Sequence, residues 1–291
     1  MLLSTNIGFL RGIYSEDETI SLLANAGFDA IDYSLGPDRT PFGLWTRENC
    51  REYADHLLAV AEKAGVRFNQ AHAPLPISLA TGQNTDDALK NVGYDNMEFV
   101  FHVCKLLKIP HIIIHGLSHP AVSISHEYRF QANLNYFRTL REIAEPMGVR
   151  LAVENLGRTF SRPETITAFL DALDDEYYMA CVDIGHSNFV NGHADRMIRM
   201  LGSRVQALHV HDNHGDYDEH LIPGMGTADW PNILQALADV GYRGDFTTEF
   251  CNFGTSCVKP GQGYNTEFIP CLMKFGAQSA RYLMNRLEHM K

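Results

Sequence analysis

The chain has 291 residues, of which 45% are hydrophobic, and this length suits two domains or one large barrel. Its formal net charge of −11 argues against nucleic-acid and anionic-membrane partners, because both need clustered positive charge. No apolar stretch is long enough to span a membrane, the start does not resemble a signal peptide, and the six cysteines form no CxxC pair, so we expect a reduced, cytoplasmic protein.

Eight short apolar or β-branched runs along the chain predict strands. They are Leu2–Phe9, Phe28–Ser34, Val66–His72, His111–His115, Val149–Glu154, Met179–Asp183, Val205–His209 and Asp245–Phe250. Most of these runs are apolar at consecutive positions, which is typical of a parallel sheet that is buried on both faces.

Helical patterns separate the eight runs. The first opens at Ser15 with a capping-box sequence, and apolar residues at i, i+3, i+4 spacing mark the later ones. These later helices are predicted at Thr46–Ala64, Asn84–Leu107, Tyr128–Met147, Pro163–Leu173, Ala194–Leu201, Trp230–Val240 and from about Asn265 onward. Eight strand–helix repeats without a GxGxxG motif favour an α/β protein with a closed (β/α)8 TIM barrel over an open sheet. With no linker, we expect a single domain over residues 1–291.

Three acidic residues and one histidine lie at or near the ends of the last four predicted strands. They are Glu154, Asp183, His209 and Glu249. Because the carboxyl ends of barrel strands meet at one face, residues from different strands can share one ion. Oxygen and imidazole ligands suit a divalent cation, so the sequence predicts a metal site there. The plainer alternatives are a buried ion pair with an arginine such as Arg158 for the glutamates, and a helix cap for Asp183.

Histidines gather at the same predicted face. Seven of the fourteen lie at or just beyond strand ends: His72, His115, His186, His209, His211, His214 and His220. A single histidine is more often a structural residue, but their joint placement beside carboxylates favours a site. His209 and His211 alternate on one strand and point to the same side, so we expect His209 to be the ligand and His211 to line the pocket. Asp218 and His220 belong to a loop that could equally be solvated.

These motifs resemble the xylose isomerase-like TIM-barrel superfamily, which includes sugar isomerases and epimerases, hydroxypyruvate isomerase, inosose dehydratase and endonuclease IV. The matching segments are VENLG, DIGHSN, LHVHDN, DEHLIPGMGTADW and TTEF, with NQAHAPLP and IIIHG extending the match to strands three and four. Resemblance to the ketose 3-epimerases implies one manganese or cobalt ion on the quartet named above, with His186 on the substrate.

Resemblance to endonuclease IV, which uses nine ligands for three zinc ions, implies additional ligands. These would be His72, His115, His186, Asp218 and His220. The acidic loops, such as HGDYDEH and DALDDE, oppose DNA binding, and PGMGTADW looks more like the isomerase and epimerase branch. The chain departs from xylose isomerase itself in lacking a strand-end lysine beside the predicted metal.

We therefore expect a metal-dependent isomerase or epimerase of a small sugar, cyclitol or related polyhydroxy carbonyl compound. Manganese, cobalt or magnesium is the expected ion, and zinc if the larger ligand set is used. Glu154 and Glu249 would be the catalytic acid and base, while His186, His211 and Arg158 would bind the substrate. The alternatives are an inosose-dehydratase-like lyase, an endonuclease IV-like three-zinc phosphodiesterase and a non-catalytic sugar-binding barrel. A homo-oligomer is also open.

Overall fold

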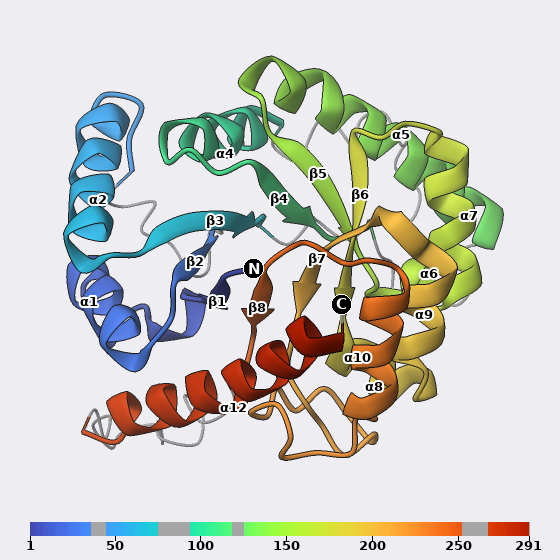
Figure 1. Ribbon diagram of the computed structural model, residues 1–291. Coiled ribbons are helices and arrows are strands. Elements are labelled where there is room, and N and C mark those ends of the chain that lie inside the picture. The colour runs from blue at the N-terminus through green and yellow to red at the C-terminus, as the bar shows by residue number, and fades with distance from the viewer. Residues whose placement is uncertain (36–44, 75–93, 118–124, 252–266, 291) are drawn as a thin grey trace.

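The computed structural model describes residues 1–35, 45–74, 94–117, 125–251 and 267–290. In these residues eight parallel strands form one sheet, surrounded by helices (Figure 1). The strands are β1 (Leu3–Asn6), β2 (Ala30–Ser34), β3 (Arg67–His72), β4 (His111–Ile114), β5 (Arg150–Glu154), β6 (Tyr178–Asp183), β7 (Val205–His209) and β8 (Phe246–Thr248). Each of them falls within or overlaps a predicted run.

The sheet closes on itself, which confirms the predicted (β/α)8 TIM barrel. Consecutive strands pair in parallel from β1 to β7, and β8 pairs with β1. The remaining seam joins β7 to β8 just beyond their ends: the backbone N–H of Val210 donates to Thr247 O at 2.8 Å, and that of Glu249 donates to Val210 O at 3.1 Å. This seam lies directly beside two of the predicted metal ligands, His209 and Glu249.

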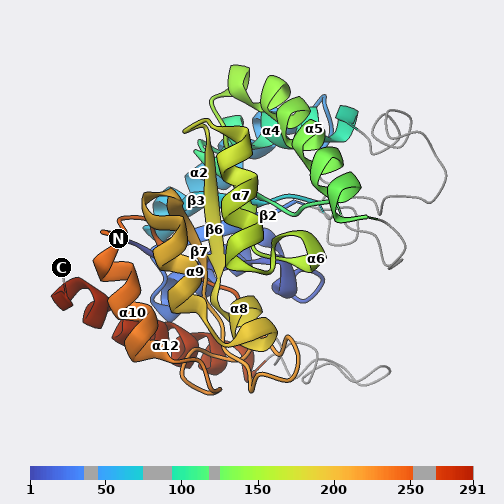
Figure 2. The ribbon, with the colours of Figure 1, turned by 90° about the vertical axis from the view of Figure 1, so that its right-hand side faces the viewer.

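Helices cover the outside of the barrel (Figure 2). The long ones are α1 (Glu16–Ala26), α2 (Cys50–Ala64), α4 (Tyr94–Leu106), α5 (His126–Ala144), α7 (Pro163–Leu173), α9 (Ala194–Leu201), α10 (Trp230–Asp239) and α12 (Ile269–Met290). The predicted capping box forms at the start of α1, where the side chains of Ser15 and Glu18 bond each other's backbone N–H groups. The first ten residues of the helix predicted at Asn84–Leu107, and Asn265, lie outside the described residues.

Short helices occur where none was predicted. They are α6 (Gly157–Phe160) and α8 (Ile184–Asn191), together with the 3-10 turns η1 (Gly8–Leu10), η3 (Glu145–Met147) and η4 (Gly202–Arg204). Both α6 and α8 follow closely on the ends of β5 and β6. α6 has only four residues, too few for a periodic apolar pattern, and α8 is no longer than α9 but begins at the strand-end residue Asp183.

The hydrophobic core has two parts. The larger part fills the space between strands and outer helices. The smaller part fills the interior of the barrel and consists of Ile113, Ala152, Met179, Cys181 and Ala207, each at most 3% exposed. Because these side chains fill the interior, the polar groups at the strand ends lie above a packed apolar layer and not above an open pore.

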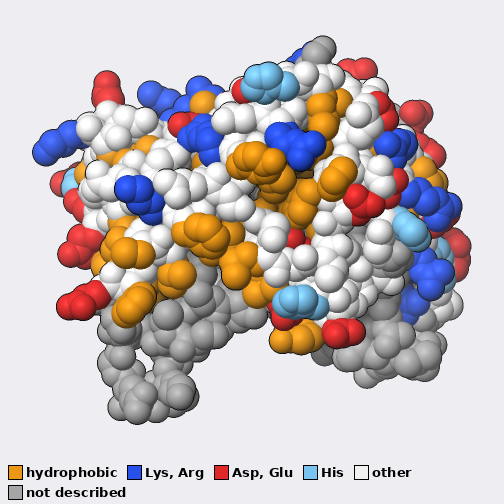
Figure 3. Space-filling model, turned by 60° about the horizontal axis from the view of Figure 1, so that its bottom comes forward, with side chains coloured by type: hydrophobic (Ala, Val, Ile, Leu, Met, Phe, Trp, Pro, Cys, Tyr) orange, Lys and Arg blue, Asp and Glu red, His pale blue; other side chains and the backbone are white. Residues whose placement is uncertain are grey.

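Some apolar surface stays exposed on α12 and at Phe268, the residue before it. Phe268, Phe275 and Tyr282 follow one another at seven-residue spacing and are 59%, 50% and 61% exposed. Figure 3, which brings the lower side of Figure 1 forward, shows apolar side chains gathered on that face. Within the described residues, none of the helices combines the length and apolar character that crossing a membrane requires.

Candidate metal centre

The four predicted ligands meet at the carboxyl ends of their strands. Glu154, Asp183 and His209 are the last residues of β5, β6 and β7, and Glu249 follows β8. One ligand atom from each lies within 4.8 Å of the others. His209 Nδ1 is 2.7 Å from Glu154 Oε1, 3.4 Å from Glu249 Oε2 and 3.9 Å from Asp183 Oδ2. We call this group the central cluster.

A buried carboxylate sets the orientation of the His209 ring. His209 Nε2 lies 3.3 Å from Asp32 Oδ2, and Gln70 Nε2 donates to the same oxygen at 3.1 Å. A ring whose Nε2–H is held by a carboxylate presents its Nδ1 to the cluster, as metal-binding histidines commonly do. Sequence reasoning missed Asp32 and Gln70. Their only signal is a polar residue inside a strand, in AIDYS and RFNQAH.

A second cluster consists of His72, His115 and Glu154, with ligand atoms within 4.8 Å of one another. His115 Nε2 is 2.5 Å from Glu154 Oε2, without the geometry of a hydrogen bond, and His72 Nε2 is 3.9 Å from the same oxygen. His72 Nδ1–H donates to Ala73 O at 2.9 Å, which leaves its Nε2 free to face the cluster. Glu154 therefore belongs to two clusters, with one oxygen toward each.

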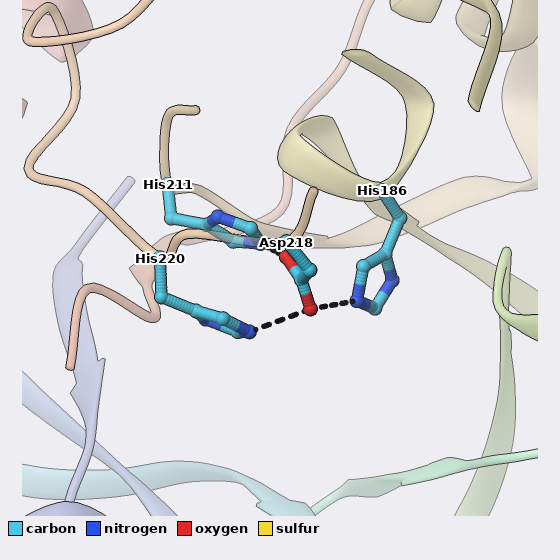
Figure 4. A group of neighbouring side chains, drawn as sticks. All are labelled: His186, His211, Asp218 and His220. Carbon is cyan, nitrogen blue, oxygen red and sulfur yellow. Dashed lines mark hydrogen bonds and ion pairs between the residues drawn. The ribbon is translucent and has the colours of Figure 1, made fainter. Parts of the chain in front are cut away.

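A third cluster consists of His186, His211, Asp218 and His220 (Figure 4). Asp218 Oδ2 lies between His220 Nε2, at 2.9 Å, and His186 Nε2, at 3.3 Å. His220 Nδ1–H donates to the backbone oxygen of Glu249 at 2.7 Å, so this ring too presents Nε2. The rings of His211 and His220 stack with centroids 4.0 Å apart. The loop is thus folded against the strand ends.

Asp183 caps a helix and also faces the central cluster, so its position agrees with both interpretations of its sequence context. Its Oδ1 accepts a hydrogen bond from the backbone N–H of His186 at 2.7 Å, which caps α8. The same oxygen is 3.0 Å from His211 Nε2, and Oδ2 faces His209. The helix cap fixes the carboxylate in place, so the plain interpretation and the metal interpretation do not exclude each other.

Another buried carboxylate, Asp212, organises the loop that carries Asp218 and His220. Its side chain accepts hydrogen bonds from the backbone N–H groups of Gly224 at 2.9 Å and Ala228 at 3.1 Å, and from Trp230 Nε1 at 2.9 Å. A Cβ on Gly226 would lie 2.4 Å from Asp212 Oδ1, so only glycine fits there. The PGMGTADW segment is therefore built around Asp212.

The carboxylates and histidines of the clusters shift one another's pKa values toward the charged forms. Burial raises the pKa of Glu154, but His115 and His209 lower it well below its usual range. Burial likewise raises the pKa of Asp183, yet His186 and other neighbouring groups hold it below the usual value. Although burial lowers the pKa of His186, Asp183 and Asp218 raise it to about 9. The carboxylates are thus ionised, and His186 carries a proton that a bound metal would replace.

Unpaired buried atoms show that these residues fit a metal. Glu154 Oε2, His186 Nδ1 and Asp218 Oδ1 are buried, and none has a hydrogen-bond partner among the described residues. Buried polar atoms are normally hydrogen-bonded, and a cation between them would remove this deficit. Carboxylate and imidazole donors suit magnesium, manganese, cobalt or zinc.

Two predicted residues do not join the clusters in the described structure. The side chain of Arg158, predicted to bind substrate, lies outside the described residues. His214 is 56% exposed and bonds Glu219 Oε2 at 2.8 Å, away from the clusters. The other predicted residues, His186 and His211 included, all lie in one cluster or another.

Comparisons with known proteins place this geometry in context. A family model described as xylose isomerase-like TIM barrel matches residues 20–268. The D-psicose 3-epimerase of Ruminiclostridium cellulolyticum is 24% identical over 241 residues, which cover 79% of this chain and 76% of that protein. With some other curated relatives the match is shorter, and in one case it spans 42% of the relative.

Solved structures share the fold over nearly the whole chain. A D-psicose 3-epimerase with D-tagatose, from Clostridium cellulolyticum H10, has a TM-score of 0.76 and 19% identity over 98% of this chain and 99% of that one. A crystal structure of the IOLI protein with a binding zinc atom has a TM-score of 0.72 and 17% identity over 99% of this chain and 98% of that one.

Proposed function

The chain belongs to the xylose isomerase-like TIM-barrel family, and from this premise we propose that it is a divalent-metal-dependent isomerase or epimerase of a small sugar or related polyhydroxy carbonyl compound. The observation that carries the proposal is the central cluster, in which Glu154 and Glu249 both approach His209 Nδ1. Relatives that act on ketoses support the substrate class.

The proposed ligands of the ion are the four residues of the central cluster. When bound there, a divalent ion would supply Lewis-acid stabilisation of the negative charge that develops on the substrate oxygens. Magnesium, manganese or cobalt suits the three carboxylates, while the added histidines of the neighbouring clusters suit zinc. Elemental analysis of the purified protein would identify the ion.

The two glutamates are proposed to move the proton on the carbon next to the carbonyl. Glu249 has a partly exposed side chain, at 14%, and so can meet a substrate that enters from solvent. Glu154 is buried, and its pKa lies well below the usual range because His115 and His209 outweigh the effect of burial. The carboxylate is therefore ionised and has a free lone pair for the substrate proton, while its lowered pKa makes it a weaker base than an ordinary glutamate.

Histidines around the glutamates would orient the sugar. His186 lies in α8, and His211 lies two residues beyond the end of β7. Both contact Asp183 at the carboxyl end of the barrel. Their N–H groups can donate hydrogen bonds to substrate hydroxyls. Such bonds hold the sugar in one orientation, which epimerisation at a single carbon requires. If zinc occupies the third cluster, the same two residues would serve it instead.

Heavy water tests the proposal directly. We would incubate the metal-loaded protein with a panel of ketoses and a ketocyclitol in D2O and follow deuterium on carbon by NMR. Exchange with a change of configuration at one carbon is the expected result, and Glu249→Gln should lower its rate by about a thousandfold. Glu164→Gln, on the outer surface of α7, is the matched control and should exchange at the parent rate.

The same panel separates the alternatives. Loss of water from the cyclitol, with no epimerised product, would show the lyase chemistry of an inosose dehydratase. Binding without any exchange would show a sugar-binding barrel and would overturn the enzymatic proposal.

A second candidate function, a three-zinc phosphodiesterase, is favoured by one observation. The central and second clusters share Glu154, and His186 of the third cluster has its Nδ1 3.7 Å from Glu154 Oε1, as a multinuclear site would require. The net charge of −11 opposes it, because DNA binding needs a positive groove. Two or three zinc ions per chain, together with cleavage of abasic DNA, would establish this candidate. About one ion per chain and no cleavage would remove it.

Several expectations from the sequence stay predictions. They are the single domain over residues 1–291, the cytoplasmic location and the homo-oligomer. The exposed aromatic side chains of α12 supply apolar surface for self-association, and sedimentation at two protein concentrations would test it.

A further inference from the structure

A cavity of about 370 Å³ opens at the amino ends of the strands, at the opposite end of the barrel from the metal ligands. Its walls come from the starts of β3, β4 and β7 and from the segment that leads into β8. The ligands described above all lie at the carboxyl ends of strands or in the loops that follow, so none of them lines this cavity. We call it the amino-end pocket.

Three cations line the amino-end pocket: Arg67, Lys108 and Arg243. Within the described part of the chain, none of their side chains has an ion-pair partner. The pocket also contains a carboxylate, Asp245, but its oxygens already accept hydrogen bonds from the backbone N–H of Leu2 at 2.8 Å and from Asn69 Nδ2 at 3.1 Å. The pocket therefore carries net positive charge in a chain whose formal net charge is −11.

Other arginines at this end of the barrel have polar partners: Arg150 donates to Gln206 Oε1 and to the backbone oxygen of Glu176, and two more are ion-paired. Arg141 pairs with Asp175 and with Glu145, and Arg204 pairs with Asp171. The charges of these two side chains are neutralised by their ion-pair partners. Those of the amino-end pocket keep theirs available for a ligand.

His111 adds a neutral donor. It is the first residue of β4 and lines the pocket, and its buried Nε2 has no hydrogen-bond partner in the described part of the chain. Burial lowers its pKa to about 4, so the ring is neutral at physiological pH. A neutral imidazole can donate one N–H to a ligand oxygen.

The backbone at Lys108 gives independent support. Lys108 follows α4 with a φ of 60°, and the bonds from Lys108 N to Lys105 O and from Ile109 N to Cys104 O form the usual glycine-type helix end. Glycine occupies the corresponding positions after α1 and α2, at Gly27 and Gly65. A lysine strains the backbone there, so its presence in the wall of a charged pocket is best explained by its side chain.

We propose that the amino-end pocket binds a phosphate-bearing small molecule. Arginine and lysine donors match phosphate oxygens, and the volume fits a small molecule but not a nucleic acid. The binding would use no residue of the metal clusters. The test of this proposal is therefore independent of the test of the proposed catalysis.

Calorimetric titration with inorganic phosphate and with a sugar phosphate, using the metal-loaded protein, tests the proposal. We expect at least one of the two to bind, and Arg243→Gln to weaken it by about tenfold. Tighter binding of the sugar phosphate would identify a phosphorylated metabolite, and equal binding would identify free phosphate. No heat up to about 10 mM of either probe would overturn the proposal.

Lys108→Gly separates a binding role from a structural one. Because glycine relieves the strained backbone, this variant should melt at a higher temperature than the parent while binding the probe about tenfold more weakly. Asp174→Gly is the matched control, since Asp174 has a φ of 44° at the end of α7 and does not line the pocket. It should raise the melting temperature and leave binding unchanged. Unchanged binding in both Lys108→Gly and Arg243→Gln would place the anion at the metal centre and refute the assignment.

Discussion

The two ends of the barrel differ in the sign of the charge that lacks a partner. At the carboxyl end, buried carboxylates such as Glu154 and Asp183 are surrounded by histidines, and several buried polar atoms have no partner. At the amino end, Asp29 is paired with Arg281 at 2.8 Å, and Asp245 is fully engaged by hydrogen bonds. One end keeps negative charge available, and the other keeps positive charge available.

The difference concerns which buried charges have a permanent partner of opposite sign. Burying an ionised carboxylate without a permanent cation costs several kcal/mol, as an order of magnitude, and sequences keep such groups only where something compensates them. In the described structure no arginine or lysine pairs with the carboxylates of the central cluster. A metal ion is the compensation that their geometry fits.

Glu154→Gln should have the largest effect, because Glu154 belongs to two clusters. Removing its charge should lower the metal content per chain and reduce any catalysed exchange by about a thousandfold or more. Elemental analysis and deuterium exchange measure the two effects. Metal content and exchange equal to those of the parent would mean that the carboxyl end is not a metal centre.

The amino end should respond to pH through His111. Its pKa is lowered to about 4 in the folded protein by burial, against an ordinary value of 6.5. The unfolded chain therefore takes up the proton first, and folding stability falls as pH drops from 6.5 to 4, by up to about 3 kcal/mol. His111→Gln should remove this part of the acid sensitivity. Urea denaturation at pH 7 and pH 4.5 gives the free energy of unfolding at each pH. The difference between the two values should be smaller for the variant than for the parent.

Equivalent substitutions at the two ends offer a sharper contrast. Asp32→Asn weakens the support of the His209 ring, so metal affinity should fall by about 10- to 100-fold. Asp29→Asn should leave metal affinity unchanged. Competition against a fluorescent chelator measures both. Equal affinities in the two variants would show that Asp32 is a structural residue only.

The ion pair between Arg281 and Asp29 should give the smallest effect. Both side chains are about one-third exposed, so solvent weakens the attraction. Arg281→Gln should lower the free energy of unfolding by about 0.5–1 kcal/mol and change neither metal content nor activity. A larger loss in chemical denaturation would mean that this end depends on its ion pairs more than we infer.

Much of the fold was predictable from the sequence, because strands and helices here have strong local signals. Each predicted strand overlaps an observed one, and the capping box at Ser15 formed as expected. The strand-end residues of the central cluster were also found, because barrel closure makes strand ends converge whatever their separation along the chain.

What the sequence hid depends on contacts between distant segments. Asp32 looks like an isolated polar residue until β2 and β7 face each other across the barrel. Arg67, Lys108 and Arg243 stand at three separate strand starts, and no motif joins them. The helix cap at Asp183 was among the sequence alternatives, and the structure shows the helix that follows it, α8.

The seam between β7 and β8 has a consequence for how the molecule matures during synthesis. Glu249 comes from the last strand, and that strand also covers the free edge of β1. A nascent chain that ends before β8 therefore has an open sheet edge and an incomplete set of ligands. Contacts between segments so far apart form late in folding. The complete set of proposed ligands therefore comes together only after most of the barrel has left the ribosome.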